Sequence, residues 1–111
     1  MSNSTKAQNV YDESVAELNR ILGSFTATDQ QKEVAQNALN TLATREGATI
    51  IESVESRTAL LNSLVSELNT VIAAVRVNPI GNAVDTLDHF VRKAEAIIED
   101  DSSEGSGTRS G

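Results

Sequence analysis

The single histidine, His89, is the residue best suited to chemistry, and its neighbours decide what it can do. Asp85 lies four residues before it and Arg92 three residues after it, so a helix places all three on one face. Asp-x-x-x-His supplies two metal ligands, whereas a metal site needs three or four. One histidine also cannot supply the paired Glu-x-x-His motifs of a di-iron bundle. We therefore expect an exposed salt-bridge network around His89, with no metal and no cofactor.

No other pattern of residues in the chain predicts catalysis. Cysteine is absent, which removes thiolate nucleophiles, thiolate metal sites and disulfides. Gly23, Gly47 and Gly81 stand alone between apolar segments, so there is no glycine-rich loop to cradle a phosphate. The serines and threonines have no histidine at a spacing that would activate them. The sequence predicts that the protein is not an enzyme.

Composition and charge narrow the classes of partner. The chain has 111 residues, which fits one domain, and a formal net charge of −7, which disfavours phosphate backbones. Three aromatic residues are too few for a base-stacking surface. No run approaches the roughly 18 apolar residues of a membrane span, and the first ten residues lack a signal peptide's apolar segment. We expect no nucleic-acid or membrane partner and a cytoplasmic protein, with secretion that needs no cleaved signal left open.

The stretch 50–75 gives the clearest structural signal. Its apolar positions follow each other at alternating steps of three and four, which keeps them on one side of a helix. Ile50, Leu64 and Val71 widen this stripe beyond what a two-stranded coiled coil needs, so the helix should pack against two neighbours. The predicted seam consists of Ile51, Val54, Thr58, Leu61, Val65, Leu68, Ile72 and Val75.

Capping patterns divide the first half of the chain into two helices. Thr5 with Gln8 predicts the start of a helix that covers 6–22, and Gly23 is placed to end it with a positive φ. The loop 23–28 follows, with Phe25 expected to fold back onto the end of the bundle. Thr28 with Gln31 predicts the start of a second, alanine-rich helix. Gly47 offers its end, and Thr49 with Glu52 predicts the start of the third helix.

A turn at 76–82 separates the third helix from a fourth. Pro79 suits the first helical position, so Asn78 is the expected N-cap, with Asn82 as the alternative. The fourth helix repeats the steps of four and three, which predicts an antiparallel hairpin with the third helix. Its apolar stripe consists of Ile80, Val84, Leu87, Val91, Ala94 and Ile98. The acidic and Gly-Ser-rich segment 101–111 has no apolar side chain and predicts a disordered tail.

These patterns together predict an all-α protein, an antiparallel four-helix bundle. The predicted domain covers 6–100, between a frayed N-terminus at 1–5 and the tail at 101–111. The alternative is a three-helix arrangement in which the second and third helices fuse through Gly47 into one rod of about 70 Å. A lone glycine destabilises a helix by only about 1 kcal/mol, so it permits either arrangement. The shift of the apolar stripe across Gly47 favours a break.

Wide apolar stripes without a chemical site indicate a non-enzymatic helical module for protein–protein interaction: an adaptor, an assembly factor or a small structural subunit. It would bind a protein partner or self-associate through helix faces, as an oligomer. The predicted core or contact residues are Ile51, Leu61, Leu64, Leu68, Val71 and Ile72. The alternative is an acidic inhibitor or antitoxin-like protein that masks a basic partner, and deletion of 99–111 would separate the two.

Overall fold

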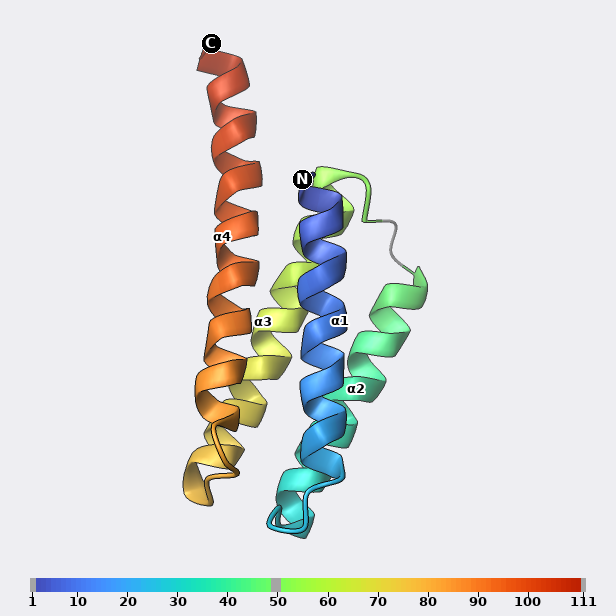
Figure 1. Cartoon of the computed structure of the whole chain (residues 1–111). Coiled ribbons are helices and arrows are strands. Elements are labelled where there is room, and N and C mark those ends of the chain that lie inside the picture. The colour runs from blue at the N-terminus through green and yellow to red at the C-terminus, as the bar shows by residue number, and fades with distance from the viewer. Residues whose placement is uncertain (1, 49–50, 111) are drawn as a thin grey trace.

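The structure, a computed structural model, describes residues 2–48 and 51–110, with side chains for 2–44 and 51–102. The described residues form four α-helices and no strand: α1 (Asn3–Leu22), α2 (Asp29–Ala48), α3 (Val54–Val77) and α4 (Ala83–Ser110). They make one elongated bundle, 52 Å long and 25 × 20 Å across (Figure 1). The predicted all-α four-helix bundle is confirmed.

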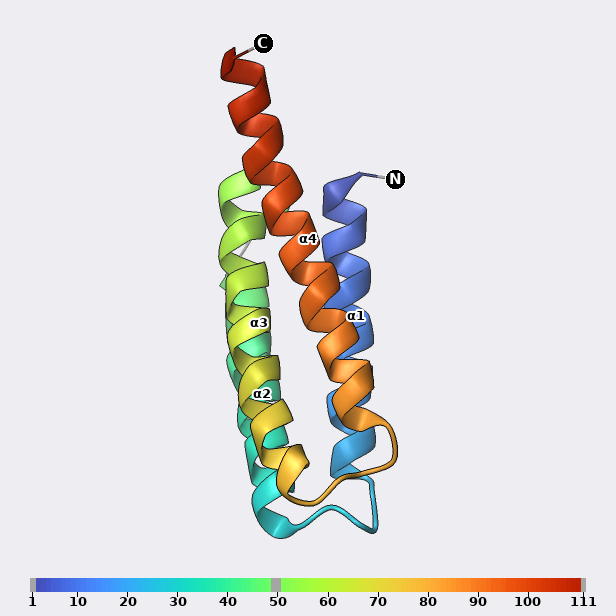
Figure 2. The same ribbon diagram turned by 90° about the vertical axis from the view of Figure 1, so that its left-hand side faces the viewer.

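Successive helices run in opposite directions, as Figures 1 and 2 show. Polar contacts place the starts of α2 and α3 beside the later part of a neighbouring helix. Gln31 near the start of α2 donates from Nε2 to the carbonyls of Ala74 (3.0 Å) and Asn78 (2.9 Å) at the end of α3. Arg57 near the start of α3 likewise binds Asp101, late in α4. Because α2 and α3 lie side by side as separate helices, the alternative with one fused rod is wrong.

One apolar core fills the space between the helices. Two of the buried residues of α2, Ala35 and Ala38, are small, as its alanine-rich face predicts, and they accompany the larger Gln31 and Leu42. The buried stripe of α3 is rotated from the predicted seam, since Val54 is 48% exposed and Val65 is only partly buried. The core of α3 consists of Leu60, Leu61, Leu64, Leu68, Val71, Ile72 and Val75.

One helix of the described part, α3, is long and apolar enough to cross a membrane by length and composition alone. A core helix of a soluble protein passes the same test, and α3 contributes more large buried side chains to this core than any other helix. The absence of a membrane partner therefore stays a prediction from the sequence.

The helix starts follow the predicted capping logic at one position and depart from it at two. At α2, Thr28 and Gln31 cap each other reciprocally: the Thr28 N–H donates to Gln31 Oε1 (2.9 Å), and the Gln31 N–H donates to Thr28 Oγ1 (3.1 Å). At α1, Ser2 is the N-cap in place of Thr5, whose N–H donates to Ser2 Oγ. At α3, Ser53 is the N-cap, four residues beyond the predicted cap Thr49, which lies outside the described residues. The motif S/T-x-x-E/Q recurs too often to fix a start alone.

The α3–α4 turn uses the alternative cap predicted from the sequence. Asn78 ends α3 instead of starting α4, because its backbone N–H donates to the Val75 carbonyl and its side chain donates to Thr26 in the α1–α2 loop. Helix α4 begins at Ala83, directly after Asn82. Gly81 has φ +53°, the left-handed region that favours glycine, whereas Gly23 ends α1 with φ −89° and not the expected positive value.

Both predicted domain boundaries fall inside helices. Residues 3–5 form the first turn of α1 instead of a frayed terminus, and their side chains contact other parts of the bundle. Helix α4 runs past 100, and Asp101 is buried. Composition alone predicts a tail from residue 101 onward. The Asp101 carboxylate instead pairs with Arg57, and this buried contact keeps residue 101 within the bundle.

Gln31→Glu is expected to lower the free energy of unfolding by about 2 kcal/mol at neutral pH, because it removes two donors to buried carbonyls. Gln31 is 3% exposed, and its bonds to the Ala74 and Asn78 carbonyls are partly buried, so water replaces them only in part. Gln30→Glu adds the same charge at an exposed neighbouring position and should change stability by less than about 0.5 kcal/mol. Urea denaturation of both variants measures the difference, and equal stabilities would contradict the role of Gln31.

Candidate functional site

The residues around His89 lie on the surface of α4 and form a different ion pair from the expected one. Arg92 Nε lies 3.0 Å from Asp88 Oδ2, one turn earlier, and no ion pair joins Arg92 to Asp85 within the described chain. His89 is exposed, and its ring centroid lies 5.8 Å from that of Phe90. Among the described residues, no group of three or more metal-ligating side chains occurs.

The six predicted contact residues lie inside the bundle. Leu61, Leu64, Leu68, Val71 and Ile72 are buried against the other helices of the same chain, and Ile51 is partly buried against this core. The wide stripe on α3 is thus covered by its own neighbours within one chain. An external contact must use another surface.

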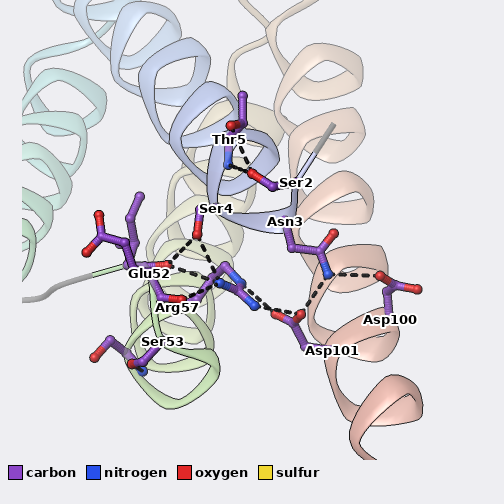
Figure 3. Close-up of polar contacts among 11 residues, drawn as sticks. Ser2, Asn3, Ser4, Thr5, Glu52, Ser53, Arg57, Asp100 and Asp101 are labelled. Atoms are coloured by element: carbon purple, nitrogen blue, oxygen red, sulfur yellow. Dashed lines mark hydrogen bonds and ion pairs between the residues drawn. The ribbon is translucent and has the colours of Figure 1, made fainter. Parts of the chain in front are cut away.

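A polar cluster, formed by the buried pair Arg57 and Asp101 with the partly buried Asn3 and Ser4, lies at one end of the bundle (Figure 3). Arg57 binds Asp101 through two parallel bonds, Nε to Oδ2 at 2.7 Å and Nη2 to Oδ1 at 2.8 Å. Its Nη1 donates to Ser4 Oγ and to the carbonyls of Ile51 and Glu52, at 3.1 to 3.2 Å. Asn3 Nδ2 donates to Asp101 Oδ1 at 2.6 Å. The cluster joins α1, α3, α4 and the segment before α3.

The electrostatics of the polar cluster favour charged side chains in spite of their burial. The side chains of Arg57 and Asp101 are 7% and 2% exposed. The bonds from Arg57 hold the pKa of Asp101 below its usual range, and the bond from Asn3 acts the same way against the opposing effect of burial. No buried side-chain nitrogen or oxygen in the described part of the molecule lacks a hydrogen-bond partner. A fully hydrogen-bonded buried network of this kind rigidifies the part of the fold that it joins.

The sequence carried a signal for this pair that apolar patterning alone overlooks. Arg57 lies three residues before Leu60 and continues the buried stripe of α3 at its first turn. Asp101 lies four residues after Ile97 and continues the stripe of α4 at its far end. In an antiparallel hairpin these two positions meet, so opposite charges at opposite ends of two matching stripes predict a buried ion pair.

The opposite end of the bundle exposes apolar side chains, here called the tip patch (Phe25 and Val77). Phe25 in the α1–α2 loop is fully exposed, so the expectation that it folds back onto the bundle is wrong. Val77 at the end of α3 is 86% exposed. The bond from Asn78 Nδ2 to the Thr26 carbonyl (2.8 Å) ties the two segments together. Beside Val77 lies a hollow of about 230 Å³, with Ala74 and Gln31 in its wall.

A second concave surface, the side groove, lies between α1 and α4. It measures about 520 Å³ and is more apolar than polar in its lining. Its lining consists of Asn3, Lys6, Asn9, Asp12, Glu13, Lys93, Ala96, Ile97 and Asp100. Sequence patterning missed this groove because it depends on the distance between two helices that are far apart in the chain.

The fold and these surfaces define the class of protein: a small acidic four-helix bundle with a polar cluster at one end and apolar side chains exposed at the other. No protein-family model, curated protein or solved structure matches the chain. Function must therefore be argued from the surfaces alone.

Proposed function

We propose that the protein is a non-enzymatic helical module for protein–protein interaction, an adaptor or small assembly subunit. The observation that carries the proposal is the full exposure of Phe25, together with the exposure of Val77 on a segment that Asn78 ties to the loop of Phe25. Aromatic side chains are enriched among residues that anchor interfaces, and burying one removes a large apolar area from water. The contact surface is thus the tip patch and not the α3 stripe.

The loop that holds Phe25 is fixed by its own hydrogen bonds. The Ser24 N–H donates to the Ile21 carbonyl at 3.1 Å, and the Thr26 N–H donates to Ser24 Oγ at 3.2 Å. The bond from Asn78 to the Thr26 carbonyl anchors the other side of the loop. A loop ordered before binding loses little conformational entropy in a complex, so a small surface can still bind specifically.

The size of the tip patch indicates a weak or transient complex. Two exposed side chains and a hollow of about 230 Å³ are small against the roughly 800 Å² per partner of a standard interface. Such a surface suits a partner with an apolar pocket for Phe25 and polar groups around it. A second copy of the chain is one possible partner, since the tip carries both a protruding ring and a hollow.

Replacing both tip residues in Phe25→Ser/Val77→Ser is expected to abolish partner capture without unfolding the bundle, because both side chains are exposed. The measurement is quantitative cross-linked capture from the native host, compared between the wild-type protein and the variant. Val54→Ser, at the opposite end, is the matched control, since Val54 is the third exposed large apolar residue of the described chain. Light scattering of the same samples detects self-association. The proposal fails if the tip variant captures the same proteins as the control.

The alternative, an inhibitor that masks a basic partner, is favoured by exposed carboxylates late in α4, namely Glu95, Glu99 and Asp100. Deletion of 99–111 no longer tests it cleanly, because the deletion also removes the buried partner of Arg57. Substituting Glu99→Gln and Asp100→Asn neutralises the surface and keeps Asp101. Masking requires this variant to lose the basic partner while the tip variant keeps it.

A further inference from the structure

The side groove is an open depression whose lining is more apolar than polar. Ala96 and Ile97 of α4 lie along it. At one end Asn3 Nδ2 bonds to Asp100 Oδ2 at 2.8 Å, and at the other Lys93 Nζ lies 3.2 Å from Glu13 Oε1. Both contacts cross from α1 to α4. The groove is thus bounded along the bundle as well as across it.

The spacing of its ends limits what the groove can hold. Lys93 and Asp100 are seven residues apart on α4, which corresponds to about 10 Å along the helix axis. This length accommodates one or two large side chains of a partner and not the whole face of a long helix. The floor is apolar, so the inserted side chain should be aliphatic or aromatic.

The charge around the groove is unbalanced towards carboxylates. Lys93 is engaged by Glu13, while Asp12 and Asp100 form no ion pair within the described chain. A neighbouring hollow on α4 shares Ala96 and Asp100 with the groove and adds further carboxylates. These are Glu95 and Glu99, and the Arg92 guanidinium beside them is engaged by Asp88.

Lys6 is the cation of the groove without an ion pair among the described residues. This one positive charge is outnumbered by four exposed carboxylates, those of Asp12, Asp100, Glu95 and Glu99. The formal charge of −7 for the whole chain adds to the same field. A cationic partner is therefore attracted to this face, and an anionic ligand is opposed by all but one of the unpaired charges.

We propose that the side groove binds a basic amphipathic segment of a partner protein, with one large apolar side chain on the Ala96–Ile97 floor. Lysine or arginine side chains on either side of that residue pair with Asp100 and Asp12. The apolar contact supplies most of the affinity, and the carboxylates select basic over acidic segments. This surface is separate from the tip patch, so either one can fail without the other.

The test uses a fluorescently labelled helical peptide with leucines on one face and lysines on the other, and a matched peptide with glutamates in place of the lysines. Fluorescence anisotropy should show binding of the basic peptide to the wild-type protein, weakening with salt, and none of the acidic one. Amide shifts in NMR should concentrate on α1 and α4 along the groove. Shifts spread over the whole surface would overturn the proposal.

Two substitutions to arginine separate groove binding from general attraction. Ala96→Arg places a large cationic side chain in the groove, which repels the lysines of the basic peptide and should weaken its binding about tenfold or more. Ala73→Arg adds the same charge at an exposed position of α3 and should weaken it about twofold or less. Equal weakening by both variants would overturn the proposal, since attraction would then be nonspecific. Circular dichroism confirms that both variants fold.

Lys6→Gln tests whether the groove binds a positively or a negatively charged segment. It removes the cation that opposes a basic segment, so the basic peptide should bind about twofold tighter. Weaker binding of the basic peptide to this variant would contradict the expected repulsion from Lys6, and binding of the acidic peptide to the wild-type protein would mean that the groove holds anions. Either result would overturn the proposal. The tip variant Phe25→Ser/Val77→Ser should bind the basic peptide like the wild-type protein.

Discussion

Replacing Asp101 with asparagine is expected to lower the free energy of unfolding by about 3 kcal/mol at neutral pH, because it leaves Arg57 as a buried charge without a counter-charge. The substitution keeps the shape of the side chain, and only the charge and one acceptor are lost. Asp100→Asn is the matched control, because the Asp100 carboxylate also accepts a hydrogen bond from Asn3 but is exposed. The control should cost less than about 1 kcal/mol. Chemical denaturation compares them, and equal losses would contradict the role of the buried pair.

The pH dependence of this loss follows from the lowered pKa of Asp101. A carboxyl whose pKa is depressed by folding contributes stability above its unfolded pKa of about 3.9. That contribution is lost as the pH falls through the folded pKa. The difference in stability between the wild-type protein and Asp101→Asn should thus be full at neutral pH and shrink below about pH 4.

A double replacement separates the effect of the unpaired charge on stability from the effect of filling the same volume. Arg57→Leu/Asp101→Leu removes both charges and should be less destabilising than Asp101→Asn, because no unpaired charge remains. Ser4 and the Ile51 and Glu52 carbonyls then lose the donors of Arg57, so some loss should persist.

The second large expected effect is a loss of about 2–5 kcal/mol in unfolding free energy on Leu64→Ala, from the lost burial and the cavity left behind. Leu64 is fully buried near the middle of α3. Val65→Ala, at the next position, should cost less because Val65 is only partly buried. Urea denaturation of both variants measures the phase of the buried stripe. A larger loss for Val65→Ala would show that the sequence-derived seam is the correct one.

This pair of variants also distinguishes core residues from contact residues. If Leu64 served mainly to bind a partner, Leu64→Ala would weaken the complex and leave the isolated bundle stable. We expect the reverse, since Leu64 lies inside the bundle.

Sequence patterning predicted the features of the fold that depend on residues close together in the chain. The four helices, the reciprocal cap of Thr28 with Gln31, the alanine-rich face of α2 and the α3–α4 hairpin all follow from spacing within about one or two helical turns. The sequence did not predict the rotation of α3 about its axis. Its stripe is apolar over a wide arc, and the positions of the neighbouring helices determine which part of the arc is buried. Val54 is exposed and Leu60 buried for that reason.

The candidate surfaces were harder to predict than the fold. Phe25 is apolar and lies in a short loop, so its hydrophobicity predicts burial, yet the loop's own hydrogen bonds hold it outside. The side groove requires α1 and α4 to be placed beside each other, which no local pattern supplies. Asp101 was assigned to a tail from composition, whereas its partner Arg57 lies 44 residues earlier.

That separation bears on how the protein is made. Because Asp101 follows Arg57 by 44 residues, a nascent chain exposes Arg57 before its partner is available, and the guanidinium can stay hydrated at the open end of the first three helices until then. We expect a chain that terminates before Asp101 to be less stable than the full chain, because the Arg57 guanidinium then lacks its counter-charge.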